Sequence, residues 1–193
     1  AFQNCTGLTN VTIPGSVTTI GVAAFSGCDG LTNIVVESGN TKYDSREGCN
    51  AIIETATNTL VAGCKNTVIP GSVTTIGYEA FAECYGLTGI TIPNSVTTIG
   101  VNAFLQCTGL TSVTIGNSVT KIESDVFRNC TCLTSIYLTG DLPPTVDNWN
   151  FTDTQYENVV LYVPEGTLAT YLAADVWKEF KNMKSSYCGD EKD

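Results

Sequence analysis

The chain has 193 residues, of which 42% are hydrophobic and 15% are charged, and its net charge at neutral pH is −10. This length and apolar content suit one folded domain with a sizeable core. The acidic balance argues against nucleic acid as a partner, and against an anionic membrane, because phosphate binding depends on clustered lysine and arginine.

An internal repeat starts at the first residues. Five phenylalanines each stand three residues before a cysteine, and neighbours are 23 residues apart except for one gap of 56 (Phe2, Phe25, Phe81, Phe104 and Phe127). A segment of this length cannot bury its own apolar face, and it does so by stacking on a copy of itself. The repeat predicts an α/β solenoid, a right-handed coil of short parallel strands that is mostly β, with short 3-10 or helical turns.

The copy at residues 87–107 shows the plan of one coil. Ile90-Thr91-Ile92 alternates apolar and polar residues, which predicts a short strand with Thr91 facing outward. Pro93 ends this strand because it has no N–H for the ladder. Residues 96–99 predict a second extended piece, and Phe104 is expected within a brief helical or 3-10 turn.

The gap of 56 residues equals one repeat plus 33, which places an enlarged coil at about residues 37–66. Within it, the apolar runs at residues 50–53 and 59–61 are separated by a polar stretch. This arrangement predicts an inserted hairpin. Insertions in solenoids usually emerge as loops on one face, and that face is often used for binding.

The pattern changes after Leu138. Residues 159–163 predict a last strand, and Pro164 begins a segment whose apolar residues predict a helix that covers the end of the stack. We therefore divide the chain into a solenoid at residues 1–163 and a C-terminal cap helix with its tail at residues 164–193. The stretch from Lys184 to Asp193 is expected to be frayed.

The chain has nine cysteines, and five of them occupy one repeat position. Their side chains should point in parallel, so we favour buried thiols that act as small hydrophobes and weak hydrogen-bond donors. Cys49 and Cys64 flank the inserted hairpin, and a disulfide between them remains open as an alternative. Cys188 is left over in the tail.

The pattern Leu-Thr-x-Val-Thr-Ile-Pro-x-Ser-Val-Thr-x-Ile-Gly-x-x-Ala-Phe-x-x-Cys, which recurs over about residues 1–138, resembles the BspA-like class of leucine-rich repeats. The inserted coil and the ending at residues 161–181 are also similar to that class. The resemblance implies an exported protein, attached to the surface of an anaerobic gut or oral bacterium, that binds host matrix proteins or other cells. No stretch is long and apolar enough to cross a membrane, so we expect no insertion by this segment.

Tyrosines and threonines are the candidate contact residues. Tyr137 continues an outward column of threonines, and three further tyrosines fall at variable positions near the insert. Exposed tyrosine is favoured at protein interfaces, although threonine also suits an exposed sheet for structural reasons alone. The predicted partner-binding residues are Tyr43, Tyr78, Tyr85, Tyr137, Thr12, Thr91 and Thr114.

Features that support catalysis are scarce. The chain has no histidine, which excludes Ser-His-Asp and Cys-His catalysis and every histidine-containing metal site. The carboxylate pairs Glu79/Glu83 and Glu123/Asp125 would serve glycoside hydrolysis only across a cleft, and no cleft is predicted. Residues 147–153 are rich in oxygen ligands but lack the glycine and the final acid of an EF-hand loop, so we expect an irregular loop there. We expect no catalytic, metal or cofactor site.

The prediction is therefore a non-enzymatic adhesion module at the bacterial cell surface. It would recognise a protein of the host or of a neighbouring cell, or a glycan, and act as a monomer outside the cell. Two alternatives remain open. A structural spacer that presents another domain would have no saturable partner, and a carbohydrate-active enzyme would need a pocket with two convergent carboxylates.

Overall fold

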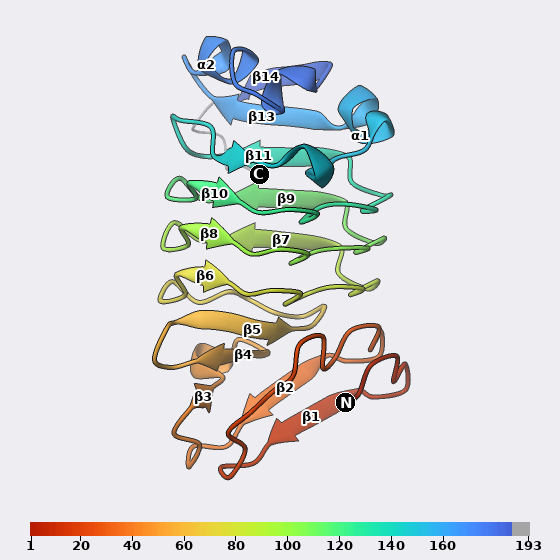
Figure 1. Ribbon diagram of the computed structural model, residues 1–193, viewed down its shortest axis with the longest axis vertical. Helices are drawn as coiled ribbons and strands as arrows, with labels where there is room; N and C mark the ends of the chain where they lie inside the picture. Colours follow the sequence, from red (N-terminus) through yellow and green to blue (C-terminus); the bar gives the residue numbers. More distant parts are fainter. Residues whose placement is uncertain (187–193) are drawn as a thin grey trace, which may run out of the picture.

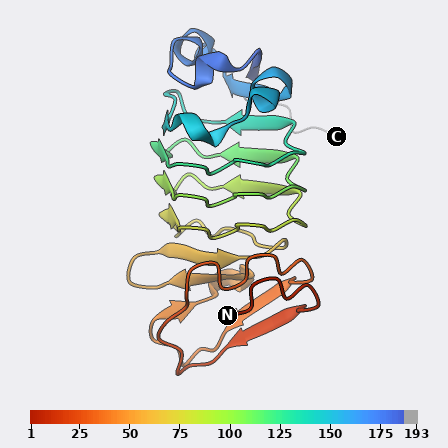
Figure 2. The same cartoon turned by 45° about the vertical axis from the view of Figure 1, so that its right-hand side comes forward.

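The computed structural model describes residues 1–186. It is an elongated stack of coils, with strands β1 (Asn10–Ile13) and β2 (Asn33–Val36) at one end and most of the helical segments at the other (Figures 1 and 2). The strands form three sheets of two, seven and five strands. This arrangement confirms the predicted repeat architecture of mostly short parallel strands.

The five-stranded sheet is parallel throughout and runs along one side of the stack, in the order β14-β13-β11-β9-β7. Consecutive strands pair one repeat apart, so Ile90 lies beside Val113, and Val113 beside Ile136. The strand expected around Thr91 is confirmed as β7. The bounds are β7 (Gly89–Ile92), β9 (Ser112–Ile115), β11 (Ser135–Leu138), β13 (Val160–Pro164) and β14 (Asn182–Ser186).

The seven-stranded sheet contains the second extended piece of each coil. Its parallel part is made of two-residue strands paired one repeat apart, so Ile76 lies beside Ile99, and Ile99 beside Ile122. These side chains are buried and face the five-stranded sheet across the core. The strands are β6 (Thr75–Ile76), β8 (Thr98–Ile99), β10 (Lys121–Ile122) and β12 (Thr145–Val146).

The enlarged coil continues this sheet instead of leaving the stack as a loop. Strands β4 (Ala51–Glu54) and β5 (Thr59–Gly63) pair antiparallel as the expected hairpin. β3 (Tyr43–Asp44), which precedes the short 3-10 helix η1 (Arg46–Gly48), pairs antiparallel with β4. Ile52, Ile53 and Leu60 are fully buried. The expectation of a protruding binding loop is therefore wrong, because the insert supplies core residues.

The enlarged coil also breaks the sheet on the other side of the stack. β1 (Asn10–Ile13) and β2 (Asn33–Val36) pair with each other only, and both are inclined to the remaining strands in Figures 1 and 2. Where the five-stranded sheet is continuous, Gly116, which directly follows β9, donates its N–H to the carbonyl of Ile92 in β7 at 2.9 Å. The equivalent position one repeat earlier is Pro93, which has no N–H to donate to Ile69. Residues 67–70 are accordingly not a strand.

Stacked aromatic rings form the centre of the core. Phe81, Phe104, Phe127 and Phe151 follow one another with ring centroids 5.0, 5.6 and 5.8 Å apart. Phe151, which follows the last copy that the repeat predicted, thus extends the aromatic column by one coil. Phe2 and Phe25 form a separate stack at 5.6 Å. The enlarged coil has Gly63 beneath Phe81, where a Cβ atom would overlap the ring, so the column is interrupted there.

The segment around each phenylalanine is a series of turns, and not the helical or 3-10 turn that was expected. Asn102 and Gln106 flank Phe104 and have φ angles of +59° and +58°. A right-handed helix requires negative φ, so these left-handed residues reverse the chain within each coil. Cys107 then donates its N–H to the carbonyl of Phe104 at 3.1 Å.

The cysteines of residues 1–186 are all free thiols. Cys28, Cys107 and Cys130 are buried, and each Sγ donates to the carbonyl of the phenylalanine one coil earlier, at 2.9, 3.0 and 3.2 Å. The buried-thiol prediction is confirmed for these three. Cys49 and Cys64 are buried and unbridged, so the disulfide alternative is wrong. Cys5 is exposed, contrary to expectation, and Cys188 lies outside the described residues.

The C-terminal end consists of short elements, and not of one long cap helix. They are η2 (Asn148–Asn150), α1 (Asp153–Asn158), α2 (Leu168–Leu172) and η3 (Trp177–Glu179). Trp177 is buried and donates its Nε1–H to the carbonyl of Pro144 at 2.8 Å, which fixes this end to the stack.

β14 adds one strand beyond β13, so residues 159–163 are not the last strand. Lys184 to Ser186 belong to β14 and are not frayed, whereas the rest of that stretch lies outside the described residues. The boundary between residues 163 and 164 stays a proposed division of the chain.

Candidate functional site

The outer surface of the five-stranded sheet, here called the sheet face, is the candidate site. Side chains alternate along each strand, so Ile90, Val113, Ile136 and Leu161 point into the core and are buried. Their neighbours point outward and form two columns across the strands. One column contains Thr91, Thr114, Tyr137, Tyr162 and Lys184, and the other contains Gly89, Ser112, Ser135, Val160 and Asn182.

Two tyrosines lie at the centre of the sheet face. The rings of Tyr137 and Tyr162 stack with centroids 4.6 Å apart and planes within 6° of each other. On its other side, Tyr137 has Thr114 as its ladder neighbour. Threonine is much smaller than tyrosine, so the ring face on that side extends beyond its neighbour. Tyr137 is 38% exposed.

The sheet face differs in charge from the rest of the molecule. The sequence contains 19 acidic residues, and none of them lies in the strands β7, β9, β11, β13 or β14. Lys184 is the single charged residue in these strands. In a protein with a net charge of −10, the strands of the sheet face therefore carry no carboxylate.

The outward hydroxyls of the sheet face are unpaired within residues 1–186: those of Thr91, Thr114, Ser112, Ser135, Tyr137 and Tyr162. The threonines just before the strands behave differently. Thr111 and Thr134 donate their Oγ1–H to the preceding coil, at 2.8 Å to Thr88 and 3.0 Å to Thr111. The sheet face thus has hydroxyls of two kinds, some used by the fold and some available to a ligand.

The structure brings three of the seven predicted contact residues together, namely Thr91, Thr114 and Tyr137. Thr12 is exposed on β1 but belongs to the separate two-stranded sheet, where its ladder neighbour is Val35. Tyr43 is only 5% exposed, and its hydroxyl accepts the N–H of Ile20 at 3.3 Å. Tyr43 is therefore a core residue of the enlarged coil, which corrects the prediction.

Tyr78 and Tyr85 lie apart from the sheet face, in the turns that connect the strands. Tyr78 is 50% exposed, and its hydrogen bond to Glu79 raises the pKa of the phenol. Tyr85 is half-buried, which raises the pKa of its phenol, and its hydroxyl lies 3.4 Å from Glu83 Oε2.

Two further aromatic residues on the surface were not predicted as contacts: Tyr162, which is half-buried, and Trp149, which is exposed. Tyr162 completes the stacked pair, and the alternation of residues 159–163 could have placed it in the column of Tyr137. Trp149 is 67% exposed on η2, outside the sheet face. No periodic signal marks Trp149, because its coil departs from the repeat.

Two carboxylates line a surface hollow of about 330 Å³ beside β10 and β12, namely Glu123 and Asp147. Glu123 forms an ion pair with Lys121 at 2.6 Å and accepts the N–H of Val101 at 3.2 Å. Asp147 accepts the hydroxyl of Ser124 at 2.9 Å and also caps η2. Both side chains thus have structural partners.

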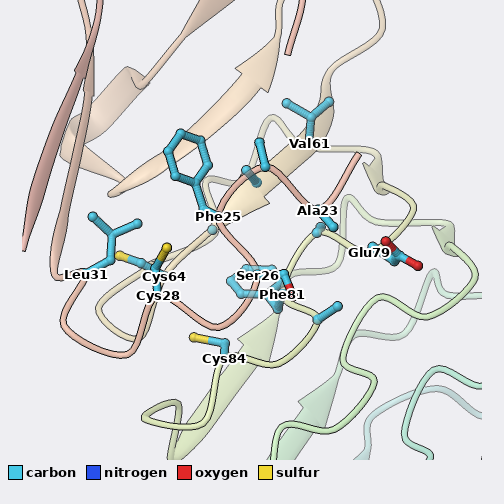
Figure 3. Close-up of a pocket in the computed structure, with 15 residues that line it drawn as sticks. Ala23, Phe25, Ser26, Cys28, Leu31, Val61, Cys64, Glu79, Phe81 and Cys84 are labelled. Atoms are coloured by element: carbon cyan, nitrogen blue, oxygen red, sulfur yellow. The ribbon is translucent and has the colours of Figure 1, made fainter. Parts of the chain in front are cut away.

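An enclosed hollow of about 20 Å³ lies between the N-terminal coils and the enlarged coil (Figure 3). Phe25, Phe81, Cys28, Cys64 and Cys84 are among its lining residues. This space suffices for about one water molecule, so it is a packing defect at the interrupted aromatic column. Among residues 1–186, no group of three or more cysteine or carboxylate side chains is arranged to hold a metal ion, and no helix could span a bilayer.

Comparison with known proteins agrees with this geometry. A family model described as the BspA type leucine rich repeat region matches residues 1–58 and 59–165 with six copies. The chain belongs to the BspA-type leucine-rich repeat family. None of the curated proteins compared with this BspA-type chain matches it.

Solved structures of bacterial leucine-rich repeat proteins share the fold of this BspA-type chain. A protein from Eubacterium ventriosum is 26% identical over 82% of this chain and 43% of its own, with a TM-score of 0.61. A leucine rich cell surface protein from Faecalibacterium prausnitzii is 24% identical over 95% and 49%, with a TM-score of 0.63. The chain therefore spans less than half the length of either relative.

Proposed function

We propose that this BspA-type module is displayed outside a bacterial cell and binds, without catalysis, a protein on a host or neighbouring cell. The observation that carries this proposal is the acid-free sheet face with its stacked tyrosines. Tyrosine is enriched at binding hot spots, whereas acidic residues are depleted from interface cores. The Faecalibacterium prausnitzii relative is a leucine rich cell surface protein, which supports the extracellular location.

The fold is better suited to binding a partner than to catalysing a reaction. Leucine-rich repeats stack into extended surfaces that contact partners over several coils, and their function depends on exposed positions. Here Thr91, Thr114, Tyr137 and Tyr162 present one continuous column over four neighbouring strands. We further propose that the module acts as a monomer, for which light scattering should give a mass close to 20.5 kDa.

Binding of the labelled chain to immobilised extracellular-matrix preparations and to intact bacterial cells tests the proposal. We expect saturable binding, and we expect Tyr137→Ala to weaken it by at least about tenfold, as is usual for truncating an aromatic hot spot. Tyr78→Ala is the matched control, since Tyr78 is an exposed tyrosine away from the sheet face. Absence of saturable binding to every preparation would leave the spacer as the better explanation.

A further inference from the structure

We propose that the sheet face recognises the glycan carried by its protein partner, with a pyranose ring stacked on Tyr137. This inference rests on the proposed function, because it assigns a chemical group to the partner of the same surface. It goes further in naming sugar rings, and not polypeptide, as the part that is contacted. Three features of the sheet face carry it: an open aromatic ring face, unpaired hydroxyls, and the absence of carboxylates.

The aromatic feature is the free face of Tyr137. A pyranose has one side that presents mainly C–H groups, and these pack favourably on the electron-rich face of an aromatic ring. Tyr162 covers one face of Tyr137 at 4.6 Å and holds the ring orientation before any ligand arrives. On the opposite side the ladder neighbour is the much smaller Thr114, and Tyr137 is 38% exposed. A ring fixed in advance loses little conformational entropy on binding.

The second feature is the row of hydroxyls beside this ring. Thr91, Thr114, Ser112 and Ser135 have no hydrogen-bond partner within residues 1–186, so their hydroxyls can both donate and accept. The strands are about 4.8 Å apart, a distance comparable to one sugar unit in an extended glycan. Successive sugars along the stack would therefore meet equivalent hydroxyls from successive coils.

The middle of this face offers no free strand edge for main-chain pairing with a peptide. An extended peptide gains affinity by adding to a free strand edge through main-chain hydrogen bonds. Here β9, β11 and β13 lie inside the sheet and are paired on both sides. From β9 and β11, the strands at the centre of the sheet face, the outward side chains are hydroxyls and one tyrosine ring, groups that suit sugar rings and their hydroxyls.

The third feature is charge. Carboxylates would repel an acidic sugar, and the strands of the sheet face contain none. Lys184 contributes one positive charge at the β14 end of the column. Neutral and acidic glycans are both compatible with this distribution, whereas a cationic ligand would gain more from the carboxylate-bearing sides of the molecule.

The test uses immobilised glycoproteins that carry mannose-, galactose- and N-acetylhexosamine-containing glycans, each intact and after mild periodate oxidation. Periodate cleaves the vicinal diols of sugars and leaves the polypeptide in place. We expect saturable binding to at least one intact glycoprotein and loss of at least tenfold in affinity after oxidation. Soluble oligosaccharide released from that glycoprotein should compete for the same sites.

Four variants of the whole chain locate the contact. Tyr137→Ala should weaken binding by at least about tenfold, and Tyr137→Phe, which keeps the ring, should retain most of it. Thr114→Val removes one hydroxyl at nearly constant shape and should weaken binding about three- to tenfold. Tyr78→Ala should bind like the wild type. Circular dichroism melting curves verify that each variant is folded.

The outcomes separate this inference from the proposed function. Equal binding to intact and oxidised glycoprotein would overturn the glycan inference and leave protein recognition standing. Glycan binding that Tyr78→Ala weakens as much as Tyr137→Ala would overturn the assignment to the sheet face. Absence of saturable binding to every glycoprotein of the panel would overturn the inference as a whole.

Discussion

At the residue scale, the stacked phenylalanines and the outward threonines have opposite roles within the same coil. Phe104 is fully buried between the rings of Phe81 and Phe127, whereas Thr91 projects into solvent from β7. The free energy of folding should therefore depend strongly on the first and weakly on the second.

Phe104→Ala should lower the free energy of unfolding by about 3–5 kcal/mol, because it removes a buried ring and leaves a cavity between two coils. Thr91→Ala should change it by no more than about 0.5 kcal/mol, the usual range for an exposed position. Urea denaturation followed by circular dichroism measures both. Similar losses in the two variants would contradict the assigned faces.

The repeat predicted which residues point inward because the apolar positions recur with a fixed spacing. The prediction of burial was wrong for residues in coils that depart from the 23-residue repeat. Tyr43 is buried because the antiparallel pairing of β3 and β4 turns it into the core of the enlarged coil. Phe151 joins the aromatic column although its coil is 24 residues long and has no cysteine three residues later.

At the element scale, the turns after Phe81, Phe104 and Phe127 hold a thiol away from water. Burial raises the pKa of Cys84 and of Cys130 to about 12, and it raises that of Cys107 well above its usual range. In the unfolded chain these thiols have a pKa of about 8.5. The folded state therefore retains protons that the unfolded state loses in alkaline solution.

The sign of the pH dependence follows from this difference. The stability that the neutral thiols contribute is fully present below about pH 8.5 and is lost as the pH rises towards about 12. Each such thiol lowers the free energy of unfolding by about 1.4 kcal/mol per pH unit in that window. Urea midpoints measured from pH 7 to pH 10.5 should fall accordingly.

Cys130→Ala provides the control for this pH dependence. The variant should be less stable than the wild type at pH 7, but its stability should fall less steeply at alkaline pH, because one titrating group is gone. Parallel curves for the two proteins would contradict the assignment of the effect to buried thiols. Tyr171, whose pKa burial raises to about 12, acts in the same direction only at the upper end of the range.

The sequence predicted the strands of each coil well, because a single alternation of apolar and polar residues defines them. It predicted the turns less well, since the left-handed φ angles of Asn102 and Gln106 have no counterpart in hydrophobic periodicity. It also missed β14, whose residues Asn182–Ser186 contain a single apolar side chain. That strand forms because β13 offers an edge to pair with.

At the scale of the whole molecule, the enlarged coil divides the core in two. The larger cluster extends from the enlarged coil to the C-terminal end and contains the continuous aromatic column. The smaller one joins the N-terminal coils to Ile52 and Ala62. Phe2 at the N-terminal end is 45% exposed, whereas Phe104 is fully buried. The two parts should therefore differ in local stability.

Hydrogen–deuterium exchange should reveal this division. Amides of β1 and β2 pair only with each other and should exchange faster than those of β9 and β11, which are paired on both sides. Mass spectrometry of peptides covering residues 10–36 and 112–138 provides the comparison. Equal protection of the two regions would show that the solenoid opens as one cooperative unit.

Repetition was enough to predict a stack of coils, but not the division of its core into two clusters. The break in the sheet was not predictable from repetition, because it lies at the enlarged coil, where the N–H of Val68 donates to the carbonyl of Cys49 at 3.1 Å. The sheet face was predicted in part: Tyr137, Thr91 and Thr114 were identified from their register. The absence of carboxylates becomes apparent only once the strands are placed side by side.

The uneven distribution of charge has a consequence for encounters between cells. Bacterial and host surfaces are commonly anionic, and a molecule with 19 acidic residues is repelled from them on most of its sides. Within a Debye length of about 8 Å at physiological salt, the side without carboxylates meets the least resistance. The molecule would thus rotate during its approach and arrive with the paired tyrosines leading.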